Sequence, residues 1–386
     1  MERKINKLLL WGSYYAFIVT GMIVLIPGAI LPYLIKEFHL GYDQGGALLA
    51  LQAIGNLAAS LLGGIASDYI GRKATMTFGA ICFIIGFCGI LTVSVPILLF
   101  ASMFIAGIGW GIQNSMINVV VCDASEGNGS IMNMLHMFFA IGAFAAPFLV
   151  SLIIKMGLSW RYAVALVVIM SVILVFVFLL MPIKSQKMQR ERKYVSTAFW
   201  LNKRYYIFMA ILFLYVGTEN SINGWMVTYL SETHVLKIMT PQSLLAIFWL
   251  AIIAGRFLNA YISRLFPRES IILANSIGGA IFFIAFMLTA NQIVILLSIV
   301  AMGLFLAGIY PTTVANASGL IKGSGTAAGI MMSLGGLGAA AVPYLNGLVA
   351  QGRGIYAGMT IIILSASLLV IAAFCNVWME RKQIQP

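Results

Sequence analysis

Long apolar runs dominate the chain, and only short polar segments separate them. A helix needs roughly 20 apolar residues to cross the hydrocarbon core of a bilayer. Windows that meet this length, with ends placed to within a few residues, are 8–35, 44–66, 74–93, 97–121, 130–154, 160–182, 206–231, 242–262, 270–290, 292–316, 325–350 and 354–378. The pattern predicts an all-α membrane protein with twelve transmembrane helices.

The composition excludes a water-soluble globule, because 61% of the residues are hydrophobic and 9% are charged. The short loops leave no room for a soluble catalytic or nucleotide-binding domain, and no G-x-x-x-x-G-K-[ST] phosphate loop occurs. The four cysteines show neither disulfide nor metal spacing and are expected to pack in helices. We therefore expect no enzyme, no cofactor, no metal and no ATP-driven transport by this chain alone.

The net charge of +12 is distributed unevenly along the chain. With the N-terminus inside, five of the 23 Lys and Arg fall in outside segments, namely Lys36, Lys155, Arg161, Lys237 and Arg353. The remaining 18 lie inside, as the positive-inside rule requires. We expect a multi-pass protein of the cell membrane with both termini cytoplasmic. Its basic side would contact the lipid bilayer and favour anionic headgroups, and we expect no nucleic-acid partner.

The chain also repeats itself at a fixed offset of 196 residues. Matching positions are Gly21 and Gly217, Gly107 and Gly303, Gly142 and Gly338, Pro147 and Pro343, and Arg72 and Arg268. We predict an N-terminal six-helix half at 1–183, a basic cytoplasmic linker at 184–204 and a C-terminal six-helix half at 205–386. In transporters built from two such repeats, the substrate site lies near the midplane between the halves.

A short motif follows the second predicted helix and consists of Gly64, Asp68, Gly71, Arg72 and Lys73. It resembles the complete G-x-x-x-D-x-x-G-R-[RK] signature of the major facilitator superfamily, in which the glycines permit close helix approach and a tight turn. The resemblance implies that Asp68 caps the cytoplasmic end of the eleventh helix, near Gly323–Thr326, in the outward-facing state. Arg72 is expected to pair with Asp123. The alternative is a plain positive-inside turn.

Three further stretches resemble the fucose/glucose/galactose–proton symporter branch of that superfamily. They are Asn133 to Pro147 with His136, Tyr215 to Leu230 with Glu219 and Trp225, and Gly308 to Thr312 with Tyr310. The resemblance implies proton-coupled sugar uptake. However, the helix at 97–121 lacks the buried arginine of many proton-coupled members, and the helices at 8–35 and 97–121 lack the acids of some sugar symporters. Glu219 would then carry proton coupling nearly alone, helped by His136.

Glu219 lies in the apolar segment 207–230 with no Lys, Arg or other acid near it in sequence. A carboxylate in the hydrocarbon region costs several kcal/mol, so it faces a cavity or a partner and is a functional candidate by default. Desolvation disfavours an ionised carboxylate, which suits a group that binds and releases a proton. The alternative is an acid kept protonated for helix packing. His136 is either a proton relay or ligand contact, or a structural histidine.

Uncharged amides and aromatic residues form the candidate substrate contacts. Trp110, Gln113, Asn114 and Asn118 are expected on one helix face from their spacing. Amides pair with hydroxyl groups, and aromatic rings cover the C–H faces of sugars. The alternative for any one amide is a hydrogen bond between helices. The full set is Tyr14, Gln52, Asn56, Trp110, Gln113, Asn114, Asn133, Asn220, Asn223, Trp225, Trp249, Tyr310 and Asn346.

These observations favour a monomeric secondary transporter that works by alternating access and couples protons to uptake of a small neutral sugar-like or polyol solute. One alternative is a proton-coupled exporter or antiporter of an amphipathic drug-like or lipid-linked compound. A channel or membrane-embedded enzyme is a second, and a sensor that transports nothing is a third. The two-half repeat and the complete loop motif weigh against the channel and the enzyme.

Overall fold

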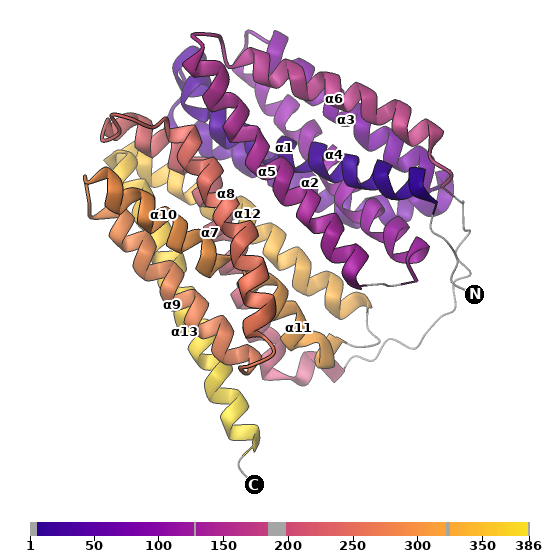
Figure 1. Cartoon of the computed structure of the whole chain (residues 1–386), viewed down its shortest axis with the longest axis vertical. Helices are drawn as coiled ribbons and strands as arrows, with labels where there is room; N and C mark the ends of the chain where they lie inside the picture. The colour runs from indigo at the N-terminus through magenta and orange to yellow at the C-terminus, as the bar shows by residue number, and fades with distance from the viewer. Residues whose placement is uncertain (1–5, 127–128, 184–197, 322–324, 385–386) are drawn as a thin grey trace. The chain divides into compact units, whose positions relative to one another are not determined.

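The computed structural model describes residues 6–126, 129–183, 198–321 and 325–384, and within these ranges the chain forms helices and short connections without a strand (Figure 1). It divides into two compact units, Met1–Arg190 and Glu191–Pro386. The helices of the first unit are α1 (Lys7–Glu37), α2 (Tyr42–Ile70), α3 (Arg72–Thr92), α4 (Pro96–Ala124), α5 (Gly129–Lys155) and α6 (Arg161–Leu180).

The second unit begins with a short 3₁₀ helix, η1 (Ala198–Leu201). Its α-helices are α7 (Lys203–Thr233), α8 (Pro241–Ile262), α9 (Arg268–Met287), α10 (Gln292–Leu306), α11 (Ile309–Ile321), α12 (Gly325–Arg353) and α13 (Ile355–Ile384). Together α10 and α11 form one membrane span, Gln292–Leu320, so the described residues contain twelve spans. The twelve transmembrane helices predicted from the sequence are confirmed.

Helix starts follow local sequence signals in both units. The side chain of Asn6 accepts hydrogen bonds from the backbone N–H groups of Leu8 and Leu9 at the start of α1. Asn202, which lies 196 residues later, caps α7 in the same way by accepting from the N–H of Arg204. Each cap accepts hydrogen bonds from backbone N–H groups that have no partner inside the helix. These bonds stabilise the helix more where little water is present to replace them. The repeat therefore extends to the caps.

Glycines set the helix pairs of the first unit. A Cβ added at Gly142 on α5 would lie 2.0 Å from the carbonyl oxygen of Ile18 on α1. Similarly, a Cβ at Gly107 on α4 would lie 2.1 Å from the carbonyl oxygen of Gln52 on α2. No other residue fits at these two crossings, because the backbones approach too closely. The first span consequently packs on the fifth, and the second on the fourth.

The second unit repeats both pairings. A Cβ at Gly338 on α12 would lie 2.0 Å from the carbonyl oxygen of Phe213 on α7, and one at Gly303 on α10 would lie 2.7 Å from that of Phe248 on α8. Phe248 is itself 196 residues after Gln52, the contact of Gly107. The sequence repeat therefore encodes the same close crossings in each unit.

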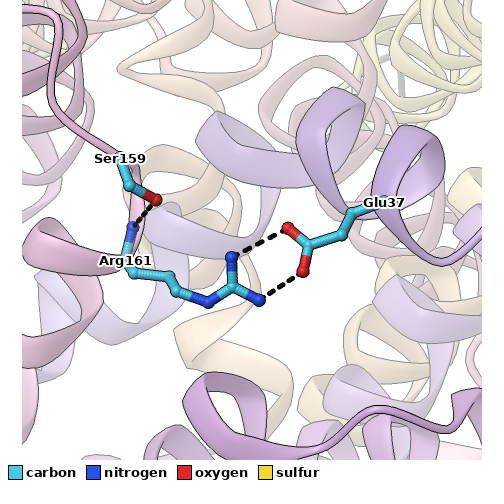
Figure 2. Close-up of polar contacts among 3 residues, drawn as sticks. All are labelled: Glu37, Ser159 and Arg161. Carbon is cyan, nitrogen blue, oxygen red and sulfur yellow. Dashed lines mark hydrogen bonds and ion pairs between the residues drawn. The ribbon is translucent and has the colours of Figure 1, made fainter.

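An ion pair joins the ends of α1 and α6 (Figure 2). Arg161 holds Glu37 through two hydrogen bonds, one from Nη1 to Oε2 at 2.9 Å and one from Nη2 to Oε1. The backbone N–H of Arg161 donates to Ser159 Oγ at 3.4 Å, and its guanidinium lies 4.7 Å from the ring centroid of Trp160. Both charged side chains are more than a third exposed, so the pair contributes little energy but fixes the orientation of the two ends.

The tenth span is interrupted between Leu306 and Ile309. At this break a Cβ added to Gly308 would lie 2.2 Å from Oδ1 of Asn259 on α8. The same oxygen accepts a 2.6 Å hydrogen bond from Nδ2 of Asn275 on α9, and both asparagines are buried. Two polar side chains, one from α8 and one from α9, thus pack directly on the backbone at the break between α10 and α11.

Candidate functional site

Glu219 lies near the middle of α7 and has three polar neighbours in the second unit. The side chain of Tyr215, one turn earlier on α7, makes a hydrogen bond with the carboxylate. Arg256 on α8 lies within electrostatic range of the carboxylate, as does Tyr310 on α11. The rings of Tyr215 and Tyr310 lie 6.4 Å apart. Three different helices therefore supply an acid, a cation and two hydroxyl groups to one place.

The members of this group differ in how accessible they are. Tyr215 is 3% exposed, Glu219 is half-buried and Tyr310 is 37% exposed. The carboxylate is thus supported on one side by a buried hydroxyl group, while part of its surface stays accessible. An accessible carboxylate with a cation nearby can exchange a proton, and its attraction to that cation changes when it does so.

Arg256 is a neighbour of Glu219 that was not predicted from the sequence. The expectation that Glu219 carries proton coupling nearly alone, helped by His136, stays a prediction. Glu219 and Arg256 are 37 positions apart and lie on different helices, so nothing local in the sequence joins them. A glycine directly before Arg256 is a signal in the sequence for close helix approach at this point. A Cβ at Gly255 would lie 2.6 Å from the carbonyl oxygen of Leu304, so α8 packs closely on α10 beside Arg256.

Several candidate substrate contacts instead join helices inside one unit. Gln52 Nε2 donates to the carbonyl of Ile23 at 3.1 Å, and Trp225 Nε1 donates to the carbonyl of Pro343 at 2.9 Å. Asn346 is fully buried, with Nδ2 3.8 Å from the sulfur of Met359. The geometry of the two amides favours the hydrogen bond between helices that was left open as the alternative for amides, and Trp225 likewise joins two helices.

Gln113 does not share the face of α4 that the sequence predicted. It is fully buried and donates from Nε2 to the carbonyl of Met76 on α3 at 2.7 Å. Trp110, Asn114 and Asn118 are instead partly accessible. Steps of four residues turn a helix by about 40°, whereas a step of three turns it about 60° the other way, so Gln113 diverges from this face and reaches α3.

The remaining candidates fall into two groups. Tyr14 is buried and stacks on Phe138 with centroids 4.5 Å apart. Trp249 Nε1 donates to Asn223 Oδ1 at 3.0 Å, so α8 orients this amide of α7. The partly or fully accessible candidates are Asn56, Trp110, Asn114 and Asn133 in the first unit, and Asn220 and Tyr310 in the second.

His136 lies on α5, one turn after Asn133, and its ring is accessible. It meets the ring of Phe17 on α1 edge to face, with centroids 5.6 Å apart. The His136 ring thus has an aromatic neighbour and also an accessible surface. Both roles, proton relay or ligand contact on the one hand and structural histidine on the other, stay open to test.

The loop motif has the predicted turn and ion pair. Gly71 has a φ of 88°, in the left-handed region that glycine adopts most readily. Arg72 Nη1 contacts Asp123 Oδ2 at 2.7 Å, while Asp68 and Lys73 lie near the turn, Asp68 being exposed. Gly323, part of the segment expected to receive Asp68, lies outside the described residues.

The second unit keeps the arginine of this turn but changes its partner. Gly319 stands where Asp123 stands in the first unit, 196 residues earlier. Arg268, the counterpart of Arg72, accordingly donates to the backbone carbonyl of Ala315 at 2.7 Å. The two arginines therefore bind the same region of the fourth span of their units through different acceptors.

The family model of the Major Facilitator Superfamily matches residues 14–343 of the chain. The chain belongs to this superfamily. It is a transporter, not an enzyme, and an integral multi-pass membrane protein.

Curated relatives cover nearly the whole chain at low identity. A Protein TsgA homolog of Buchnera aphidicola subsp. Schizaphis graminum is 23% identical, with 99% of each chain covered. A Protein TsgA homolog of Yersinia pseudotuberculosis serotype O:1b is also 23% identical, with 95% of this chain and 93% of the relative covered. The similarity spans both six-helix halves.

Solved structures share the fold over the same length. A point mutant of the nucleoside transporter NupG matches with a TM-score of 0.80 at 18% identity, covering 97% of this chain and all of that one. A D-xylose-proton symporter matches with a TM-score of 0.78 at 16% identity, covering 97% of each chain. At these identities the likeness concerns the fold.

Proposed function

We propose that this transporter couples proton movement to the uptake of a small neutral sugar-like or polyol solute by alternating access. The observation that carries the proposal is Glu219, an acid in the middle of an apolar span with Tyr215, Arg256 and Tyr310 around it. A charged group retained at such a position is characteristic of proton relays in transporters.

In this proposal the proton binds to a carboxylate oxygen of Glu219. While ionised, the carboxylate attracts Arg256 on α8 and accepts the hydrogen bond from Tyr215. Protonation removes the attraction, so that α7 and α8 are held together less strongly and the carrier can change state. Tyr215 keeps the side chain in place during the exchange, because it is buried and one helical turn away. His136 serves as a second proton group or as a ligand contact.

The substrate class follows from the accessible candidates. Asn56, Asn114 and Asn133 in the first unit and Asn220 in the second offer amides, and Trp110 and Tyr310 offer aromatic surface. Such a set suits hydroxyl groups and C–H faces rather than a net charge. The names of the two solved transporters above each contain a hydroxylated solute, a nucleoside and D-xylose, which is in keeping with this class. The protein would act as a monomer in the cell membrane with both termini cytoplasmic.

The test is proton movement by the purified protein in liposomes, with an external pH probe and a panel of sugars and polyols. Symport predicts that one solute class makes the outside more alkaline as it enters. Glu219→Gln should abolish this coupled movement. Glu232→Gln is the matched control, because it removes an exposed carboxylate at the end of the same helix. It should leave the coupling unchanged.

Other results would select a different function. Alkalinisation of the outside while an amphipathic compound leaves the liposome, rather than while a solute enters it, would support the exporter, because an antiporter takes protons in as its substrate goes out. Glu219→Gln protein that still accumulates solute against its gradient would contradict proton coupling through this residue. Counterflow that saturates with solute would exclude a simple channel, and no flux across a broad panel would favour a sensor.

A further inference from the structure

One face of α13 carries a continuous apolar stripe that is accessible along its whole length. Its members are Leu364, Leu368, Ile371, Phe374 and Trp378, each between 43% and 59% exposed. Their spacing of three or four residues keeps them on one side of the helix. Lys382 continues the same face one turn later, and its Nζ lies 3.9 Å from the centroid of the Trp378 ring. The stripe thus ends in a positive charge.

The end of this stripe lies beyond the hydrocarbon. α13 has 30 residues, which at 1.5 Å per residue make about 45 Å, against roughly 30 Å for the bilayer core. Its last turns extend past the neighbouring helices of its unit (Figure 1). Nearby, Trp200 and Tyr206 are both exposed. Exposed tryptophan and tyrosine side chains gather at the headgroup level of membranes, so this end of α13 lies at the interface.

A hollow of about 680 Å³ opens at this level, between the start of α7 and the end of α13. Its lining includes Leu201, Asn202, Lys203, Arg204, Trp378 and Lys382. Arg204 is paired with Glu380 and also reaches Asn376 Oδ1 at 3.4 Å, so its charge is largely compensated. Lys203 and Lys382 are exposed. Three cations and one anion leave the hollow with two net positive charges.

We propose that this hollow binds the headgroup phosphate of an anionic phospholipid, whose acyl chain lies along the α13 stripe. Lys203 and Lys382 contact the phosphate, and the Trp378 ring lies at the junction of headgroup and chain. The apolar stripe that leads to the two lysines is what favours a lipid over a free phosphate, since a small anion would gain nothing from it. The proposal does not rest on the proton-coupling role of Glu219.

The test uses purified full-length protein and counts retained lipids by native mass spectrometry during titration with phosphatidylglycerol, phosphatidylcholine or inorganic phosphate. Each basic residue near an anionic lipid contributes about fivefold to affinity. Lys203→Gln with Lys382→Gln should therefore weaken phosphatidylglycerol binding roughly thirtyfold. The matched control is Arg264→Gln with Arg381→Gln, which removes two exposed charges from the same unit outside the hollow. It should weaken binding by less than about threefold.

Three results would overturn the proposal. Equal losses in the two double variants would mean that general surface charge attracts the lipid. Equal affinity for phosphatidylcholine would remove the role of headgroup charge, and displacement of phosphatidylglycerol by millimolar inorganic phosphate would indicate a free-anion site. If the double variant does not fold, Lys382→Gln alone, expected to lose about fivefold, is compared with Arg381→Gln.

Discussion

A carboxylate can stay in an apolar helix only when its neighbours offset part of the cost of removing it from water. Around Glu219, Tyr215 contributes a hydrogen bond and Arg256 contributes an opposite charge. The hydrogen bond is local, since it joins residues one turn apart on α7. The charge comes from another helix, so it depends on how α7 and α8 are assembled. The two contributions are separable by mutation.

Glu219 and Arg256 are expected to be energetically coupled. Glu219→Gln leaves the arginine without its counter-charge, and Arg256→Gln leaves the acid without its cation, whereas the double variant removes both charges together. We expect an interaction energy of roughly 0.5–3 kcal/mol in a double-mutant cycle. The measurement is thermal or denaturant unfolding in detergent. Arg264→Gln, which removes an exposed charge after α8, is the control. Strictly additive losses would mean that the pair does not interact.

Two tryptophans allow the substrate role of Asn223 to be separated from packing. Trp249 donates to Asn223 at 3.0 Å and Trp225 donates to the Pro343 carbonyl at 2.9 Å. Replacement of either by Phe loses one buried hydrogen bond, at a cost of about 1 kcal/mol in stability. Only Trp249→Phe should also weaken the apparent affinity for substrate, by roughly three- to tenfold. Transport kinetics and unfolding of both variants decide this. If Trp249→Phe and Trp225→Phe have the same apparent affinity for substrate, Asn223 is not a substrate contact.

Among the elements, helix pairs are fixed by small residues and by a few buried amides. Gly142 and Gly338 admit the backbones of α1 and α7, respectively, at equivalent places in the two units. Buried glutamines and asparagines then tie further helices together, as Gln113 does for α3 and α4. These amides look like ligand contacts in the sequence, because neither composition nor spacing tells which neighbour an amide side chain meets.

The asparagine pair at the break in the tenth span is expected to support both stability and transport. Asn259 and Asn275 meet Gly308 at the break, and Tyr310 follows two residues later. Asn275→Leu should lower stability by roughly 0.6–1.7 kcal/mol, because an interhelical hydrogen bond in a membrane has about that value. It should also slow turnover, since α11 and Tyr310 lose their support beside Glu219. Unfolding and counterflow rates are the measurements.

The control for this prediction lies on the same helix. Ser276 is buried but donates to Ile272 within α9 at 2.7 Å. Ser276→Ala therefore removes a hydrogen bond without touching the break, and its turnover should stay normal. Asn259→Leu combined with Asn275→Leu should lose less stability than the sum of the single variants. If Asn275→Leu transports as fast as the unaltered protein, the asparagine pair is only a packing contact.

For the whole molecule, the internal repeat defines two similar units, and the charge distribution predicts their orientation in the membrane. Within the described residues, each unit contains six spans and pairs its first span with its fifth and its second with its fourth. The units differ at functional positions: Glu219 in the second corresponds to buried Ile23 in the first, and Asp123 corresponds to Gly319. Duplicated residues build the scaffold, and the residues that are not duplicated are the ones proposed to act.

Asp68 is the residue at which a change of state of the whole carrier can be tested. If its carboxylate holds one end state by meeting a helix N-terminus, Asp68→Asn should slow turnover several-fold with little change in apparent affinity or stability. Asp43→Asn removes the other acid of α2, in its first turn, and should transport normally. Single-turnover and steady-state uptake in liposomes measure the difference. Unchanged turnover of Asp68→Asn would remove the gating role.

Much of the fold was predictable from the sequence because its signals are local or periodic. Span length predicted the twelve spans found in the described residues, and one offset aligned the glycines that the structure places at helix crossings in both units. The ion pair of Arg72 and Asp123 was also predicted correctly. Less of the site was predictable. Gln113 turned out to face α3, and the charge near Glu219 comes from Arg256, because contacts between helices depend on rotation and crossing geometry.

The sequence by itself determined that this chain spans a membrane twelve times in two related halves, with a lone acid in the middle of its seventh span. Hydrophobic length and charge asymmetry suffice for the spans, since the bilayer imposes both on membrane proteins. The repeat at a fixed offset suffices for the two related halves. Only the tertiary structure decided which polar side chains make hydrogen bonds between helices and which stay accessible. It also decided that α7, α8 and α11 bring Tyr215, Arg256 and Tyr310 to Glu219, because a partner of a buried charge is set by packing in three dimensions.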